Sequence, residues 1–328
     1  MKRSKSALPA AAAILGILLL ILDNEVAVNG AWEGLAFCLI TIIPTLFPFF
    51  FLSNLLCSRI SSGAIRLLRP LGRILRIPAG SELLFFTGLL GGFPVGARAI
   101  QTALDENRLT QADARRMLCF CNNCGPAFLF GMSAVLFEAC WIPWLLFGFQ
   151  FLSAIIVSLL IPASPSTPMK TTATTTSLPQ MLENALRSIA GVCGWVILFR
   201  TLLSFLEKYV LFRLPAAVRV IVTGFLEISN GCFALPIITD PKLRLILCSW
   251  LLAFGGLCVM LQTWFAAQSV DKRLYLPSKL LQSSICATLT CGVCVHPMGL
   301  IFAGTTVILM ILLQKTEKRC RNLQTVGV

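Results

Sequence analysis

Charged side chains are scarce in this sequence. Asp, Glu, Lys and Arg make up 12% of its 328 residues, whereas a soluble globular domain carries roughly 25%. The deficit excludes an ordinary soluble domain. Hydrophobic residues reach 57% instead, and apolar runs of about 17 to 25 residues recur, the length that crosses a bilayer core of about 30 Å. The sequence therefore predicts an all-α polytopic membrane protein.

The short motifs of common enzymes are also absent. The chain has no Gly-rich phosphate loop ending in Lys, no His-Glu-x-x-His and no Ser nucleophile elbow. We therefore expect neither catalysis nor a cofactor.

Metal ligands occur, but in an unsuitable pattern. Two groups share short spacing: Cys119, Cys121 and Cys124, and then Cys291, Cys294 and His296, the one histidine. A structural zinc site needs four ligands in tetrahedral geometry, and each group lies in or beside an apolar segment with no second pair nearby. Cysteines in apolar surroundings behave as small hydrophobes. We expect no metal site and a packing role for most of the fourteen cysteines.

The net charge of +13 does not indicate nucleic-acid binding, because the basic residues lie in short loops between apolar runs. Placing both termini in the cytoplasm leaves about twenty basic residues inside. Those expected outside are Lys208, Arg213, Arg219, Lys242 and Arg244. The inner loops should attract anionic lipid headgroups. Arg98 and Arg200 fall at membrane depth, and Arg200 is expected to extend its charge to the interface.

About eight full spans and two broken or re-entrant hairpins are expected. The first apolar run resembles a signal peptide without a clear cleavage site, which favours a retained helix. Residues 59–76 have the pattern of an amphipathic helix on the membrane surface, and Thr110-x-x-Asp113 has the pattern of a helix start. The expected segments are residues 7–22, 31–57, 82–104 (broken), 117–138 (interrupted), 140–162, 186–206, 217–238 (broken), 243–264, 280–296 and 298–313.

The domain organisation follows from one linker rich in Pro, Ser and Thr, which cannot bury apolar surface. The predicted units are an N-terminal helix with an acidic loop (1–30), a first repeat (31–162), the linker (163–180), a second, inverted repeat (181–297), and a last helix with a basic tail (298–328).

The two halves share landmarks. Arg76-Ile-Pro-Ala and Thr87-Gly88 in the first half match Arg213-Leu-Pro-Ala and Thr223-Gly224 in the second. In the expected topology the halves run in opposite directions. Inverted repeats with interrupted apolar segments indicate a transporter-type site near the midplane. The alternative is a duplication in which small residues only allow helices to pack closely.

The candidate site lies at the interruptions. The predicted backbone breaks are Gly91, Gly92, Pro94, Gly125, Pro126 and Gly231. The predicted solute- or ion-binding residues are Asn122, Asn123, Glu227, Ser229, Asn230 and Arg98. A carboxylate inside a membrane segment usually has a function, although Glu227 could instead cap a half-helix or pair with Arg98. The asparagines could bind a polar solute or Na⁺, or only stabilise a Pro kink.

Three motifs carry a family resemblance: Gly91-Gly92-Phe93-Pro94-Val-Gly96-Ala-Arg98, Cys121-Asn122-Asn123-Cys124-Gly125-Pro126-Ala-Phe128 and Gly224-Phe-Leu-Glu227-Ile-Ser229-Asn230-Gly231. They resemble the YlbJ-like sporulation integral membrane proteins. That family belongs to the wider nucleoside-recognition or Gate domain group, with spore maturation membrane proteins, the gate region of ferrous-iron transporters and concentrative nucleoside transporters.

The resemblance implies a multi-pass protein of a bacterial inner membrane that is needed for spore formation. The inverted repeat and its polar breaks favour a transporter or permease for an unidentified small polar, nucleoside-like solute, with a coupling cation. One departure is that the second motif has Asn123-Cys124 where the family tends to have Thr or Ser after the first Asn. The alternative function is a structural or interaction protein of the developing spore, acting through residues 59–76 and the linker. Both functions are compatible with an oligomeric protein.

Overall fold

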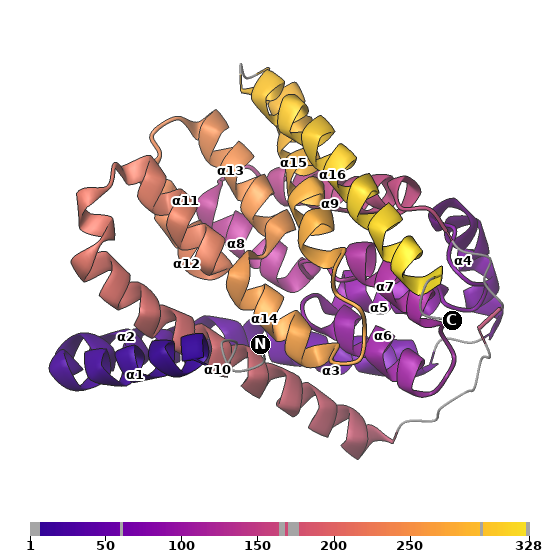
Figure 1. The fold of residues 1–328 in the computed structure, drawn as a ribbon, viewed down its shortest axis with the longest axis horizontal. Helices are drawn as coiled ribbons and strands as arrows, with labels where there is room; N and C mark the ends of the chain where they lie inside the picture. Colours follow the sequence, from indigo (N-terminus) through magenta and orange to yellow (C-terminus); the bar gives the residue numbers. More distant parts are fainter. Residues whose placement is uncertain (1–6, 60–61, 164–167, 170–176, 296–297, 326–328) are drawn as a thin grey trace.

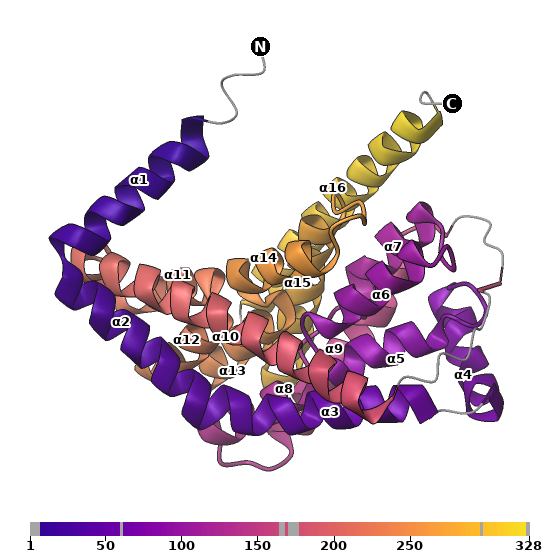
Figure 2. The same cartoon turned by 90° about the horizontal axis from the view of Figure 1, so that it is seen from below.

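The computed structural model describes residues 7–59, 62–163, 168–169, 177–295 and 298–325. Over these residues the regular elements are all helical, with sixteen α-helices, one π-helical turn and two short 3-10 turns. Figures 1 and 2 show the helices packed around a centre where several short helices end. The prediction of an all-α polytopic membrane protein is confirmed.

The first half begins with one long helical stretch and continues through short paired helices. Helices α5 and α6 pack against each other as a hairpin, and α7 and α8 form one helix that is interrupted at residues 122–125. The elements are α1 (Ala7–Leu22), α2 (Asn24–Phe37), the π turn (Cys38–Ile42), α3 (Ile43–Arg59), α4 (Ser62–Leu75), α5 (Glu82–Gly91), α6 (Val95–Asp105), α7 (Gln111–Cys121), α8 (Pro126–Leu136) and α9 (Ile142–Leu160).

The second half has the same order of elements. A long helix is followed by a hairpin of α11 and α12, an interrupted helix of α13 and α14, and another long helix. The elements are α10 (Leu178–Tyr209), α11 (Ala216–Leu226), α12 (Ile228–Ala234), α13 (Pro241–Phe254), α14 (Gly256–Ala266), α15 (Tyr275–Cys294) and α16 (Gly299–Thr325), with 3-10 turns at Leu211–Arg213 and Leu235–Ile237.

The long helices that begin the two halves pack antiparallel. Along the contact between α2 and α10, residue numbers rise on one helix while they fall on the other. Lys208 Nζ lies 2.6 Å from Asp23 Oδ2 at one end, and Cys38 Sγ lies 3.8 Å from the carbonyl oxygen of Cys193 at the other. Figure 2 shows the stretch from α2 to α3 running beside α10. Opposed first helices are the arrangement that an inverted repeat requires.

Close backbone approaches hold each hairpin together. A methyl group on Gly88 would meet the Cα of Gly96 in the first hairpin, and one on Gly231 would meet the Cα of Gly224 in the second. Gly88 and Gly224 are the glycines of the two Thr-Gly landmarks. Small residues at such positions let helices approach closely inside a membrane, so the repeat seen in the sequence corresponds to a repeated packing contact.

Within the residues that the structure describes, six helical stretches are long and apolar enough to cross a membrane by length and composition. The eight expected spans therefore include shorter or more polar elements. One is α15, which has 20 residues but many buried polar side chains. The six are Asn24–Leu52, Gln111–Leu136, Ile142–Leu160, Leu178–Tyr209, Pro241–Ala266 and Gly299–Lys318.

Several boundaries differ from the expected ones. The expected acidic loop before residue 31 is helical from Asn24 on, and Asp23 just before it pairs with Lys208 of α10. The last two expected segments are longer, and α15 and α16 pack side by side. The start of α7 agrees with the sequence: the Thr110 hydroxyl accepts a hydrogen bond from the Asp113 amide at 3.1 Å. Most of the expected linker lies outside the described residues.

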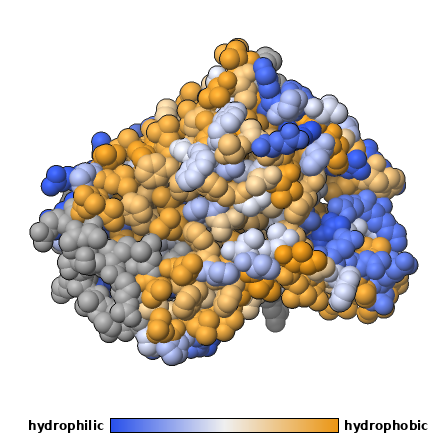
Figure 3. Space-filling model, turned by 180° about the vertical axis from the view of Figure 1, so that it is seen from behind, coloured by the Kyte–Doolittle hydropathy of each residue, from blue (hydrophilic) through white to orange (hydrophobic). Residues whose placement is uncertain are grey.

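The surface has the apolar character of a membrane protein. Figure 3 shows hydrophobic side chains over most of one face and hydrophilic ones gathered towards its edges. Large apolar side chains point outward, among them Trp32 at 68% exposure and Trp144 at 67%. Exposed apolar area on this scale indicates contact with lipid rather than water.

Candidate functional site

The hairpins and the interrupted helices meet at the centre of the molecule. At the tip of the first hairpin, a methyl group on Gly92 would clash with the backbone of Gly125 in the first break. In the second half, Gly256 lies against the carbonyl of Gly224 and the amide of Ile228. Gly92 and Gly255 have φ angles of 71° and 85°, which favour glycine. Glycine thus lets four chain breaks share one small volume.

A narrow cavity of about 50 Å³ lies at this meeting point. This volume holds a few water molecules and is below the roughly 300 to 1,000 Å³ of small-molecule sites, so a larger ligand enters only if the walls move apart. Both halves contribute to its wall. The lining residues are Ile42, Leu46, Phe49, Phe50, Gly91, Gly92, Phe93, Cys124, Gly125, Ala127, Phe128, Val192, Val196, Glu227, Ile228, Ser229, Val259 and Gln262. We call this cavity the central pocket.

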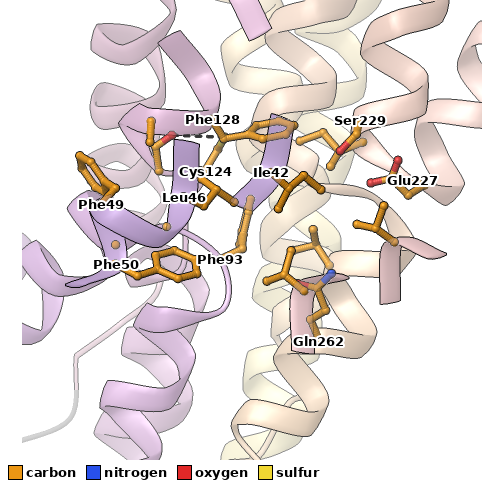
Figure 4. Close-up of a pocket in the computed structure, with 18 residues that line it drawn as sticks. Ile42, Leu46, Phe49, Phe50, Phe93, Cys124, Phe128, Glu227, Ser229 and Gln262 are labelled. Carbon is orange, nitrogen blue, oxygen red and sulfur yellow. Dashed lines mark hydrogen bonds between the residues drawn. The ribbon is translucent and has the colours of Figure 1, made fainter. Parts of the chain in front are cut away.

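The central pocket is apolar on one side and polar on the other. Figure 4 shows the rings of Phe49, Phe50 and Phe128 opposite the side chains of Glu227 and Ser229. Glu227 is the one charged side chain among the lining residues. A buried carboxylate repels an anionic ligand, so the pocket suits a neutral or cationic solute with a flat apolar part and a few hydrogen-bonding groups.

Glu227 joins the two arms of the second hairpin. It is 1% exposed and ends α11 in an extended conformation. Its Oε2 accepts hydrogen bonds from the backbone amide of Asn230 and from Asn230 Nδ2, both at 2.8 Å. The carboxylate therefore caps α12, as one interpretation of the sequence expected, and it also lines the central pocket.

The other proposed partner of Glu227, Arg98, lies elsewhere. Its guanidinium donates to the Ser188 hydroxyl at 3.1 Å, so it ties α6 to α10. The predicted Glu227–Arg98 pair is wrong, because the first hairpin carries Arg98 away from its tip. Arg98 is also absent from the lining of the central pocket.

A second, larger cavity of about 550 Å³ lies on the other side of the second hairpin. Asn230 lines this cavity while its partner Glu227 lines the central pocket. We call it the outer cavity, following the expected topology. Its lining residues are Glu33, Gly34, Phe37, Val196, Arg200, Glu207, Leu211, Arg219, Thr223, Asn230, Phe233, Ala234 and Ile237. The Glu227–Asn230 contact and Val196 thus lie between the two cavities.

The outer cavity has charged walls. Arg200 lies 2.5 Å from Glu33 Oε2 and 2.9 Å from Glu207 Oε1. The two carboxylates hold the Arg200 guanidinium at the cavity wall, and its expected extension to the membrane interface stays a prediction.

The two asparagines of the first break point away from the central pocket. Asn122 is fully buried, and its Nδ2 donates to Thr263 Oγ1 at 2.9 Å and to Tyr275 Oη at 2.8 Å. Its Oδ1 accepts from the backbone amide of Ala97 at 3.3 Å. These bonds fasten the first break to the first hairpin and to α14 and α15. Asn122 therefore lines neither the central pocket nor the outer cavity in this arrangement, and its solute contact stays a prediction.

Asn123 belongs to a second buried group that the sequence did not reveal. Its Oδ1 accepts from Lys279 Nζ at 3.1 Å and from Gln282 Nε2 at 2.8 Å. Lys279 also donates to Gln282 Oε1 at 2.7 Å and is fully buried. Gln150 Nε2 donates to the carbonyl of Cys124 at 2.6 Å. We call Asn123, Lys279, Gln282 and Gln150 the buried amide group.

The predicted site residues thus fall into separate places. The central pocket takes Glu227 and Ser229 together with the breaks Gly91, Gly92 and Gly125. Asn230 faces the outer cavity, while Asn122 and Asn123 lie in buried networks. Pro94, Pro126 and Gly231 shape the hairpins and the start of α8 without lining either cavity. The sequence did not predict that Gln262 and the phenylalanines line the central pocket, because only the fold brings these side chains together. The phenylalanines are Phe49, Phe50, Phe93 and Phe128.

Metal ligands do not converge in the part of the chain that the structure describes. No group of three or more His, Cys, Asp or Glu side chains there could hold a metal ion. The prediction for the group at Cys291 involves His296, which lies outside the described residues.

Comparison with known proteins gives one relevant match. The chain is 27% identical to the sporulation integral membrane protein YlbJ of Bacillus subtilis (strain 168), over an alignment that covers 76% of this chain and 73% of the relative. The chain is similar to YlbJ. No family model matches this chain, and no solved structure matches it. The similarity supports the resemblance to the YlbJ-like proteins over about three quarters of the chain.

Proposed function

We propose that this chain is a multi-pass protein of a bacterial inner membrane with a role in sporulation, and that it acts as a permease for a small solute rather than as an enzyme. The sporulation role comes from the similarity to YlbJ. Both termini are placed in the cytoplasm, where the basic loops and tail contact anionic headgroups.

The permease activity rests on one observation. Two hairpins and two interrupted helices from opposed halves surround the central pocket, and the Glu227 carboxylate faces into it. Helix interruptions at matching positions of inverted repeats mark the substrate site in secondary transporters. Membrane-depth backbone without helical hydrogen bonds persists where protein or a wet cavity surrounds it.

The solute is proposed to be neutral or cationic and to carry a flat ring, as a nucleoside does. The ring would lie between the phenylalanine side chains, while hydrogen-bonding groups would meet Glu227, Ser229 and Gln262. The outer cavity would deliver the solute, and the Glu227–Asn230 contact would separate the two cavities between transport steps.

The experiment is a count of heat-resistant spores in a null strain of the source organism. Wild type should restore the count, whereas a Glu227→Gln/Ser229→Ala variant should not, at equal membrane abundance. Glu183→Gln is the matched control, because Glu183 lies on α10 and pairs only with the exposed Arg187 in the described contacts. Normal spores from the null strain would refute the sporulation role, and full rescue by the pocket variant would refute the permease site.

The second candidate function is a structural or interaction protein. It is favoured by α4, which lies at one edge of the molecule in Figure 2 and exposes Arg69 and Arg73. An Arg69→Glu/Arg73→Glu variant should then lose spores while the pocket variant keeps them. If the charge reversal rescues the null strain as well as wild type, the interaction hypothesis is wrong.

A further inference from the structure

Lys279 lies behind two walls of the central pocket. Phe93, at the tip of the first hairpin, lines the pocket, and its ring centroid lies 5.4 Å from Lys279 Nζ. Cys124 also lines the pocket and directly follows Asn123, whose Oδ1 accepts a hydrogen bond from Nζ at 3.1 Å. The pocket is smaller than a nucleoside-sized solute needs, so its walls part when such a solute enters. Where they part beside Phe93 and Cys124, water reaches the amine.

The hydrogen bonds of Lys279 fit a neutral amine. The side chain is fully buried, and the described hydrogen bonds give Nζ two acceptors, Asn123 Oδ1 at 3.1 Å and Gln282 Oε1 at 2.7 Å. An ammonium has three N–H donors, whereas a neutral amine has two. Two acceptors therefore satisfy the neutral amine, while an ammonium would keep one buried N–H without a partner, which is unfavourable.

Lys279 has no ion-pair partner among the salt bridges of the described residues. The groups that act most directly on it are the thiols of Cys119, Cys121, Cys124 and Cys286, and a thiol buried in apolar surroundings stays protonated and neutral. The helices packed against α15 are α7, α9, α13 and α16. Their described titratable or charged side chains, with those of α15 and the first break, are Asp113, Arg115, Arg116, Cys119, Cys121, Cys124, Lys242, Arg244, Cys248, Tyr275, Cys286, Cys291, Cys294, Lys315, Glu317 and Lys318; α9 has none.

Burial decides the protonation state of Lys279. A charge that leaves water is costly unless a counter-charge and a full set of hydrogen bonds compensate it. The rings of Phe93 and Tyr275 attract a cation, but their centroids lie 5.4 Å and 6.0 Å from Nζ, close to the limit of about 6 Å for such a contact. They offset only part of the cost, so the closed pocket favours the neutral amine. Water reverses the preference, because a hydrated lysine stays protonated up to about pH 10.

We propose that Lys279 is a proton-binding site, empty while the central pocket is closed and filled when the pocket opens. When water reaches the amine, the nitrogen lone pair forms an N–H bond with a proton from that water, and the ammonium is hydrated. Closing returns the proton to water. The proton is then the coupling ion of the permease, a statement that rests on the proposed function, whereas the uptake of a proton on opening does not.

The direction of the pH dependence follows from this uptake. Because the open state binds one proton more than the closed state, a lower pH favours opening. Between the pH at which the closed state becomes protonated and the pH at which the open state loses its proton, the open population falls tenfold for each unit of rising pH.

The test measures the alkylation of Cys124 by iodoacetamide in the full chain, in detergent, by peptide mass spectrometry. Cys124 is 1% exposed in the closed pocket, so its alkylation reports opening. Each rate is divided by the rate in SDS at the same pH, which removes the intrinsic reactivity of the thiol. At about pH 8 and about pH 9 a hydrated lysine is protonated and a buried one is neutral.

For the wild type we expect corrected alkylation to be about tenfold slower at about pH 9 than at about pH 8, the change that one proton produces. Lys279→Met binds no proton and should lose this difference. Gln282→Glu should lose it too, because a carboxylate beside Nζ keeps the ammonium in the closed state. Lys242→Met, at the exposed start of α13, should keep the wild-type difference.

Two results would overturn the proposal: a corrected wild-type rate that is equal or faster at about pH 9, or a wild-type difference that persists in Lys279→Met. Thermal unfolding of each variant, followed by tryptophan fluorescence, checks that it is folded. If Lys279→Met does not fold, Gln282→Glu decides the matter, and a wild-type difference in that variant overturns the proposal. A failed search for a solute would count against the permease and leave the alkylation result unchanged.

Discussion

The two halves of this protein use the same elements but place their polar groups differently. In the first half the side-chain amides of Asn122 and Asn123 lie at the break of the interrupted helix. They form buried hydrogen bonds with Thr263, Tyr275 and Lys279. In the second half the break is made of glycines, and the polar groups lie on the hairpin, where Glu227 and Ser229 face the central pocket. The first half therefore acts as a fixed frame, and the second carries the groups that can meet a solute.

The largest loss of stability is expected from substitutions at the paired glycines, because both halves use this packing contact. Gly88→Ala and Gly231→Ala would each force a methyl group into neighbouring backbone, and overpacking of this kind costs about 1 to 3 kcal/mol or more. Each variant should unfold at a clearly lower temperature in detergent. Gly131→Ala and Gly191→Ala, where an added methyl meets open space, should not. Equal behaviour of the two sets would show that the hairpins are packed differently.

The second prediction compares a substitution in the first half with one in the second half. Asn122→Ala removes three buried hydrogen bonds, with Thr263, Tyr275 and the Ala97 amide, at about 1 kcal/mol each, whereas Ser229→Ala removes a group that lines a cavity. We expect Asn122→Ala to lower the unfolding temperature much more than Ser229→Ala does. If Ser229→Ala is the more damaging change, the frame lies in the second half.

A third effect concerns the walls of the outer cavity. Glu207→Gln and Glu33→Gln each remove one of the two carboxylates beside Arg200. These pairs are partly exposed, so each change should cost about 1 kcal/mol or less, and the double variant should cost more than the sum because Arg200 loses both partners. Thermal unfolding of the three variants measures the coupling, and strict additivity would contradict the three-residue arrangement.

The smallest effect is expected in the loop between α14 and α15, where Asp271 of the second half pairs with Arg115 of the first. Burial acts to raise the pKa of Asp271, but hydrogen bonds from Arg273 and Arg115 outweigh it and bring the pKa from its ordinary value of 3.8 to about 2. A lowered pKa contributes stability that is present above about pH 4 and is lost as the pH falls towards about 2.

Unfolding temperatures between about pH 5 and about pH 2 measure this contribution. Asp271→Asn should have a smaller acid-induced decrease than wild type, while Asp105→Asn, whose carboxylate bonds only to Gln101 among the described contacts, should decrease as wild type does. Identical curves for Asp271→Asn and wild type would show that the Arg115–Asp271 pair does not stabilise the fold.

Much of the fold could be predicted because it is local. Apolar length and the position of glycines, prolines and asparagines locate the breaks, and Thr110 starts a helix as its spacing indicates. Glu227 was found because an acid within an apolar run is unusual. The partners of Arg98 and Arg200 could not be predicted, because they lie on α10, far away in the sequence.

Lys279 shows the same limit. It lies one residue before the expected start of an apolar segment at 280 and therefore resembles a basic residue at the end of a span. The helix begins earlier, at Tyr275, and the buried end of this helix brings Lys279 to the first break. Only tertiary packing distinguishes a buried lysine from one at the interface.

The measurement that tests the central claim most directly is a thermal-shift panel of neutral and cationic nucleosides and nucleobases on the purified chain. Wild type, Ser229→Ala and the matched control Ser204→Ala, on α10, are compared at saturating solute. The account predicts a solute that stabilises wild type and Ser204→Ala but not Ser229→Ala. A solute that stabilises all three variants equally, or stabilisation by anionic nucleotides alone, would contradict a binding site at the second hairpin.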